Sequence, residues 1–181
     1  IANNPDVIIA DEPTSSLDTR TSKEIVKLLK SLQIKHKSTL IFITHDIRLL
    51  KEISDQIILI NEGEIEANIL NDGKSDTILS EYAKRYLELT HSPLVFRPTI
   101  SDGDAIVLAV HSVCKTYRQT GFFSFFSSHQ TYVLTDIQFV LKKGRMLGVL
   151  GESGSGKTTL GKIISGILDP TQGSIFYNGK S

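Results

Sequence analysis

One short glycine-rich segment constrains the fold of this chain more than any other. Residues 151–158 read GESGSGKT and fit the pattern G-x-x-x-x-G-K-[ST]. The apolar run RMLGVLG precedes the segment, and KTTLGKIISGIL, with apolar residues at helical spacing, follows it. Glycines let such a turn fold its N–H groups inward, and the helix N-terminus adds positive partial charge. The segment therefore predicts an α/β fold with a phosphate-binding loop between a buried strand and a helix.

The side chains of this loop have separate tasks toward a bound phosphate. Lys157 is expected to reach the β- and γ-phosphates, and the hydroxyl of Thr158 to ligate Mg²⁺. A chance glycine-rich turn is the alternative, but the eight positions and both flanks match. The residues predicted to contact nucleotide are Gly151, Ser153, Gly154, Ser155, Gly156, Lys157, Thr158 and Thr159.

Polar residues follow two further apolar runs near the start of the chain. VIIA, before Asp11 and Glu12, predicts a fully buried strand of the parallel type. Ligands of open α/β sheets bind at the carboxyl ends of such strands. One carboxylate there can hold Mg²⁺ through water, and its neighbour can polarise an attacking water. TLIFIT at 39–44 predicts a second buried strand, which would deliver His45 to the same edge; a solvated loop histidine is the alternative.

The remaining pattern alternates helices and strands. Residues from Lys23, around 47–53 and over 76–89 have helical spacing, and Asp18 to Thr21 supply capping residues. QIILINEGEIEANIL predicts a hairpin that turns at Asn61–Gly63. Residues 91–104 form a linker; AIVLAVHSVCKTYR and QTYVLTDIQFVLKKG are strands around the insertion GFFSFFSS, and QGSIFYNGK is a final strand.

Composition excludes several classes of protein. Twenty basic and twenty acidic side chains cancel, so no overall field favours nucleic acid or an anionic membrane. The single cysteine, Cys114, excludes intramolecular disulfides, and no apolar run reaches the roughly 18 residues of a membrane helix. Because the 181 residues open with Ile1 and stop at Ser181, we expect a segment of a longer polypeptide.

These motifs resemble the ATPase domain of ABC transporters. VIIADEPTSSLD looks like the Walker B motif and D-loop of that family, and TLIFITHD resembles its H-loop strand. GESGSGKTTLGKIISGILDPTQGSIFYNGK resembles its Walker A segment and the strand that follows. The resemblance implies a P-loop NTPase (RecA-like) parallel sheet with flanking helices and an antiparallel β subdomain. ATP and Mg²⁺ are the cofactors that it implies.

The resemblance also implies roles for individual residues. Glu12 would be the general base, His45 the switch histidine, and Asp11, with Thr158, would be associated with Mg²⁺. Tyr117 matches the A-loop aromatic residue on which adenine stacks, with an exposed strand tyrosine as the alternative. The D-loop, which crosses a dimer interface in the family, would consist of Ser16, Leu17 and Asp18.

The order of the motifs is reversed relative to the family. There the phosphate loop comes first, and a Q-loop, a helical subdomain and an LSGGQ-type signature precede the acidic strand; this chain contains none of the three. A tandem protein explains the order, with residues 1–90 the C-terminal part of a first ATPase domain and 91–104 a linker. Residues 105–181 are then the N-terminal part of a second domain. The two sets of ligands would belong to different nucleotide sites.

A circularly permuted single core is the other explanation. The 14 residues of 91–104 can span roughly 45 Å when extended, so the two halves can close on each other. The strand before the phosphate loop would then share a sheet with the strands that end at Asp11 and Thr44. Even such a core would lack the signature serine of an opposing domain. We therefore expect weak ATP binding and poor turnover from this segment alone.

The function that the resemblance implies is ATP hydrolysis that powers solute transport. The stretch GESGSGKTTLGKIISGIL and the G-F-F insertion before it are most similar to oligopeptide, dipeptide and nickel importer ATPases, which suggests a peptide or nickel. Permease subunits and a second ATPase domain are the expected partners, at the cytoplasmic side of the bacterial inner membrane, without nucleic acid. The alternatives are a soluble tandem ATPase acting on ribosomes or DNA, and a nucleotide-binding module without turnover. The D-loop stretch SSLD and the short linker favour transport over the ribosome-acting alternative.

For the Phe-rich insertion, GFFSFFSS, two roles are open. It would contact the membrane or a permease, or its rings would cover the domain's own edge.

Overall fold

The computed structural model of the chain describes residues 5–71, 82, 84, 105–118 and 130–180. The predicted linker at 91–104, the Phe-rich insertion and most of the predicted helix over 76–89 lie outside the described residues. The helices and strands, in chain order, are β1 (Val7–Asp11), α1 (Thr19–His36), β2 (Thr39–Thr44), α2 (Ile47–Ile53), β3 (Gln56–Asn61), β4 (Glu64–Leu70), β5 (Ile106–Arg118), β6 (Gln130–Lys142), β7 (Met146–Leu150), α4 (Lys157–Ile164) and β8 (Gln172–Tyr177).

A five-stranded sheet joins the two halves of the sequence. Its strand order is β1-β2-β7-β3-β4, so β7, from the C-terminal half, lies between two strands of the N-terminal half. Strand β7 runs parallel to both neighbours, with Ile41 opposite Leu147 and Ile58 opposite Val149. Only β4 is antiparallel. The permuted single core, one of the two explanations for the motif order, is the arrangement that this structure has.

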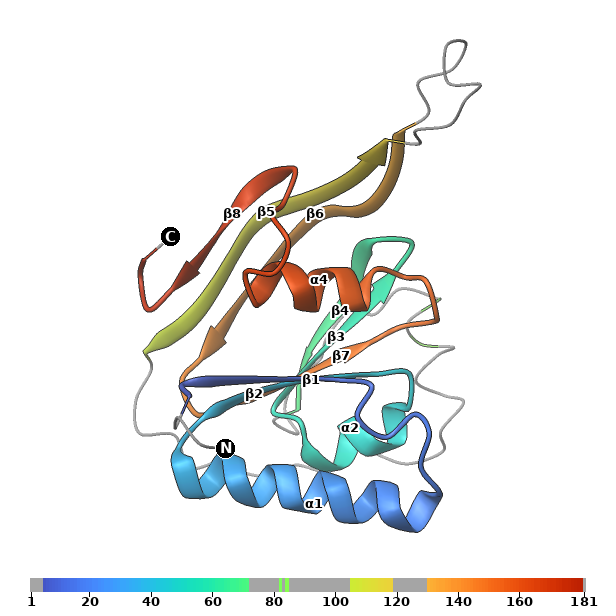
Figure 1. The fold of residues 1–181 in the computed structure, drawn as a ribbon, viewed down its shortest axis with the longest axis vertical. Coiled ribbons are helices and arrows are strands. Elements are labelled where there is room, and N and C mark those ends of the chain that lie inside the picture. Colours follow the sequence, from blue (N-terminus) through green and yellow to red (C-terminus); the bar gives the residue numbers. More distant parts are fainter. Residues whose placement is uncertain (1–4, 72–81, 83, 85–104, 119–129, 181) are drawn as a thin grey trace.

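This sheet is the middle one of three layers of secondary structure (Figure 1). Helices α1 and α2 cover one face, while α4 and a second sheet lie over the other. The second sheet is antiparallel, with strand order β6-β5-β8, which confirms the predicted antiparallel β subdomain. In the described ranges, no helix combines the length and the apolar character needed to cross a membrane.

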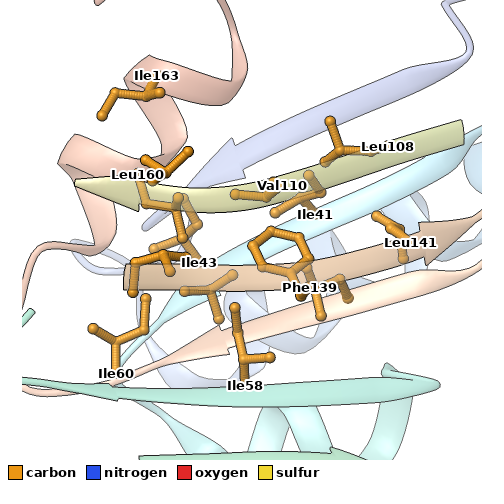
Figure 2. Packing of buried hydrophobic residues seen from close by; sticks show 14 of the residues in the cluster. Ile41, Ile43, Ile58, Ile60, Leu108, Val110, Phe139, Leu141, Leu160 and Ile163 are labelled. Carbon is orange, nitrogen blue, oxygen red and sulfur yellow. The ribbon is translucent and has the colours of Figure 1, made fainter. Parts of the chain in front are cut away.

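Two hydrophobic cores lie on opposite faces of the five-stranded sheet. Because successive side chains of a strand point to opposite faces, Ile41 and Ile43 of β2 enter one core, and Leu40 and Phe42 enter the other. Figure 2 shows the first core, in which the sheet packs against α4 and the antiparallel sheet. Its buried members include Ile58, Ile60, Leu108, Val110, Phe139, Leu141, Leu160 and Ile163. The second core packs the sheet against α1 and α2.

The prediction of a fully buried strand before Asp11 is wrong. Residues Val7–Ala10 of β1 are only partly buried. The cause is position, because among the described strands β1 pairs only with β2 and forms one edge of the sheet. The equally apolar β2, paired on both sides, is buried along its whole length.

Local capping explains where the helices begin and end. Asp18 is the N-cap of α1, and its Oδ1 accepts the backbone N–H groups of Arg20 and Thr21, each at 3.0 Å. This confirms the predicted capping segment. Helix α4 ends at Ile164, four residues before the predicted end, and Gly166 follows with a φ of 70°.

The predicted hairpin is confirmed as β3 and β4, and the final strand, β8, ends at Tyr177.

Candidate nucleotide-binding site

The sheet brings the polar motifs of both halves to one edge. Strands β1, β2 and β7 are parallel neighbours, so their carboxyl ends lie side by side. The acidic pair follows β1, His45 follows β2, and the phosphate loop connects β7 with α4. Strand pairing therefore brings the phosphate loop next to the acidic pair and His45, which lie more than 100 residues away in the sequence. This edge is where open α/β sheets place their ligands.

A pocket of about 750 Å³ occupies this edge. The N-terminal half contributes Glu12, Ser15 and His45 to its wall, and the C-terminal half contributes Val133 of β6. Residues 152–154 and 156–159, from the phosphate loop and the first turn of α4, complete the lining. The volume lies within the range of about 300–1,000 Å³ typical of small-molecule sites. Residues from both halves therefore face one shared space.

Lys157 is buried and lines this pocket. Its Nζ donates hydrogen bonds to the carbonyl oxygens of Gly151, at 2.9 Å, and Glu152, at 2.7 Å. Burial lowers the pKa of the Lys157 ammonium, while the negative charges of Glu12 and Asp11 act in the opposite direction. The acidic pair thus lies within electrostatic reach of the loop lysine, although neither carboxylate is an ion-pair partner at the described geometry.

Glu12 and His45 form a direct pair across the ends of β1 and β2. Nδ1 of His45 lies 3.1 Å from each carboxylate oxygen of Glu12. An ionised carboxylate can only accept, so Nδ1 is the donor. Glu12 also has a φ of 46°, and its N–H donates to the carbonyl oxygen of Ile43 at 2.9 Å. The backbone of β2 and the imidazole of His45 together hold the Glu12 side chain against the pocket.

Several residues predicted from the motifs do not line the pocket. Asp11 is exposed at the end of β1, and Gly151 is buried behind the loop. Ser155 is also buried, and among the described side chains its hydroxyl is one of the few buried polar groups without a hydrogen-bond partner. In the D-loop, Ser16 and Leu17 are exposed. Backbone hydrogen bonding from Thr21 lowers the pKa of Asp18, which serves as the helix cap.

Tyr117 does not line the pocket. It lies on β5 opposite Thr131, is 44% exposed, and has the Lys115 ammonium 5.4 Å from its ring centre. The pocket residue supplied by the antiparallel sheet is Val133, two positions further along the paired strand. The adenine-stacking role of Tyr117 stays a prediction.

Sequence reasoning missed three pocket residues. Ser15 lies in the stretch DEPTSSLD and Glu152 in the phosphate loop, so the motifs around them already indicated that both could lie near the site. Val133 has no signal in the sequence, because only the packing of β6 over the phosphate loop brings it to the pocket.

Comparisons with known proteins agree with the geometry of this site. The ABC transporter family model matches residues 134–181. The peptidoglycan transport ATP-binding protein YejF of Agrobacterium fabrum is 30% identical over 191 aligned positions, which include all of this chain and 33% of that protein. The glutathione import ATP-binding protein GsiA is 28% identical in Shigella flexneri and 27% in Escherichia coli; each alignment covers 97% of this chain and 32% of the relative. The chain spans about a third of the length of these relatives. Along nearly its whole length, the chain is therefore similar to ABC transporter ATP-binding proteins.

Proposed function

We propose that this chain binds ATP in the pocket shared by its two halves and contributes to ATP hydrolysis. One observation carries the proposal: Glu12, His45 and Lys157 line a single pocket, although they come from segments more than 100 residues apart. Phosphoryl transfer to water requires a basic side chain that binds the phosphates and an acidic side chain that accepts a proton from water, and both lie at this edge of the sheet.

The chain's own groups have separate roles in this proposal. Backbone N–H groups of the loop and of the first turn of α4 receive the phosphates. Lys157 exchanges its hydrogen bonds to the Gly151 and Glu152 carbonyls for bonds to phosphate oxygens. The Glu12 carboxylate accepts a proton from the attacking water, and His45 keeps that carboxylate oriented.

Magnesium is the proposed metal. Thr158 lies in the pocket wall, and the charge of Asp11 reaches Lys157 beside it, so a hydroxyl and a carboxylate lie near the phosphate position. Oxygen ligands with one carboxylate and substrate phosphates are what Mg²⁺ prefers. The described residues contain no cluster of three His, Cys, Asp or Glu side chains, so the phosphates would have to complete the coordination. When bound, the ion would neutralise phosphate charge.

For the whole protein we propose an ATPase component of a solute transporter, peripheral to the cytoplasmic face of a bacterial inner membrane. Permease subunits and a second ATPase domain would be its partners. The relatives named for glutathione import and peptidoglycan transport support a peptide-type solute over nickel. The division into parts of two tandem domains, 1–90 and 105–181, stays a proposal for that longer protein. The competing function, a nucleotide-binding module without turnover, predicts binding without phosphate release.

The Lys157→Ala variant tests the proposed site. We expect its affinity for a fluorescent ATP analogue to fall about 10- to 100-fold, because a charged hydrogen-bond donor to phosphate is lost. The measurement is a fluorescence titration of the 181-residue chain, with phosphate release followed separately in the same samples.

Lys162→Ala is the matched control, since Lys162 lies exposed on the same helix. Unchanged affinity in Lys157→Ala, or equal losses in the two variants, would remove the phosphate loop from the proposed role. Binding by the unaltered chain without detectable phosphate release would favour the non-catalytic module.

A further inference from the structure

The turn between β3 and β4 has a backbone shape that suits glycine. Glu62 and Gly63 both have positive φ, at 47° and 82°, which is the combination of a type I′ hairpin turn. A second turn of this kind lies after β8, where Asn178 and Gly179 have φ values of 48° and 75°. The two turns differ in their surroundings. A Cβ at Gly179 would meet nothing within 4 Å, whereas Gly63 is buried.

Gly63 joins the N-terminal half to the phosphate loop through its main chain. Its N–H donates to the carbonyl oxygen of Ser155, inside the loop, at 3.2 Å. Its own carbonyl oxygen accepts the N–H of Thr135, on β6, at 2.8 Å. One residue therefore ties the loop to the strand whose Val133 forms part of the pocket wall.

Close packing at the Val133 carbonyl leaves little freedom at this junction. A Cβ at Gly63 would lie 2.6 Å from the Val133 oxygen, and a Cβ at Gly156 would lie 2.7 Å from the same atom. Behind the loop, a Cβ at Gly151 would lie 2.3 Å from the Ile60 oxygen, at the end of β3. The obstructing atoms are backbone, which cannot rotate away. The β3–β4 hairpin and β6 thus enclose the phosphate loop from two sides.

We infer that Gly63 is a positioning residue for the phosphates of the bound nucleotide. It acts through Ser155 by holding the loop in the place from which the backbone N–H groups proposed to receive the phosphates reach the pocket. A side chain at position 63 displaces the hairpin from β6 or the loop from the hairpin, and either movement shifts those N–H groups. The inference rests on the proposed nucleotide site and adds a residue from outside every phosphate-binding motif in the sequence.

The test compares Gly63→Ala with Gly179→Ala in the 181-residue chain. Both substitutions place a side chain at a positive φ in the same kind of turn, but only the first meets backbone atoms. We expect Gly63→Ala to weaken binding of a fluorescent ATP analogue about tenfold, with little change in Gly179→Ala. A fluorescent AMP analogue is titrated in parallel. Its affinity should fall less, because the displaced loop is proposed to bind the β- and γ-phosphates, which AMP lacks.

The ratio of ATP to AMP affinity separates positioning from a general loss of folded protein. Loss of folded protein lowers both affinities by one factor and leaves the ratio unchanged. An unchanged ratio in Gly63→Ala, or the same change in Gly179→Ala, would overturn the inference. If the unaltered chain binds neither nucleotide, the proposed function fails first, and the two failures are thereby distinguished.

A measurement on the unaltered chain covers the case in which Gly63→Ala does not fold. Nucleotide should slow amide hydrogen exchange at Gly63 at least fivefold, since its N–H bonds to the ordered loop, while Gly179 should not respond. Equal responses of the two amides to saturating ATP would also overturn the inference.

Discussion

Glu12 is one of six non-glycine residues with a positive φ in the described part of the chain. Non-glycine residues at positive φ are uncommon and usually persist where the surroundings fix them. Here the surroundings are specific: the Glu12 N–H bonds to Ile43 of the next strand, and the carboxylate faces the His45 ring at 3.1 Å. The side chain is consequently turned toward the pocket and away from the axis of β1. That orientation suits a group that must accept a proton from water above the phosphates.

In the intact parent protein, Glu12→Gln should preserve nucleotide affinity and slow phosphate release about a hundredfold or more, because the amide keeps the size of the side chain but cannot accept the proton. Single-turnover phosphate release, normalised to bound nucleotide, is the measurement. Glu24→Gln, on the exposed surface of α1, is the control. Release at the unaltered rate in Glu12→Gln would exclude Glu12 as the general base.

Strand β7 determines the architecture at the scale of elements. It is buried along its whole length and hydrogen-bonds to β2 on one side and β3 on the other. The strands that it joins share a core with α4 and the antiparallel sheet, shown in Figure 2. The stability of the site is therefore tied to packing between elements of both halves, and not only to the loops that line the pocket.

Ile58→Ala should destabilise the chain by about 2–5 kcal/mol, because Ile58 is fully buried next to β7 and its removal leaves a cavity. Ile106→Ala is the matched control on a strand, since Ile106 is 49% exposed; its expected cost is about 1 kcal/mol or less. Chemical denaturation followed by circular dichroism gives both values. Equal costs would contradict a core that extends across the two halves.

Periodicity predicted nearly every strand, because runs such as TLIFIT and RMLGVLG are short, apolar and bounded by polar residues. It could not predict their order in the sheet, and this explains the error at β1. An apolar strand looks the same in sequence whether it lies at the centre or at an edge. The same limit applies to the pocket: the motifs identified Glu12, His45 and Lys157, but the position of Val133 depends on how two sheets pack.

At the scale of the whole molecule, hydrogen bonds between the halves surround the shared sheet. Buried Gln33 donates its amide to the Gly144 carbonyl at 2.7 Å, and Gly144 N–H donates to the Thr39 hydroxyl at 2.9 Å. Met146 N–H donates to Asp55 Oδ2 at 2.7 Å. These bonds fix the turn before β7 against α1, β2 and the start of β3. Together with the two cores, they make one folded unit from the segments on either side of 91–104.

Both halves of the sequence form one sheet, and its edge holds the pocket proposed to bind nucleotide. Nuclear Overhauser contacts between methyl groups of the 181-residue chain test this claim most directly. We expect contacts between Ile41 of β2 and Leu147 of β7 and between Ile58 of β3 and Val149 of β7, which are opposite each other in the sheet. Contacts confined to pairs within each half, with none from β7 to β2 or β3, would contradict it.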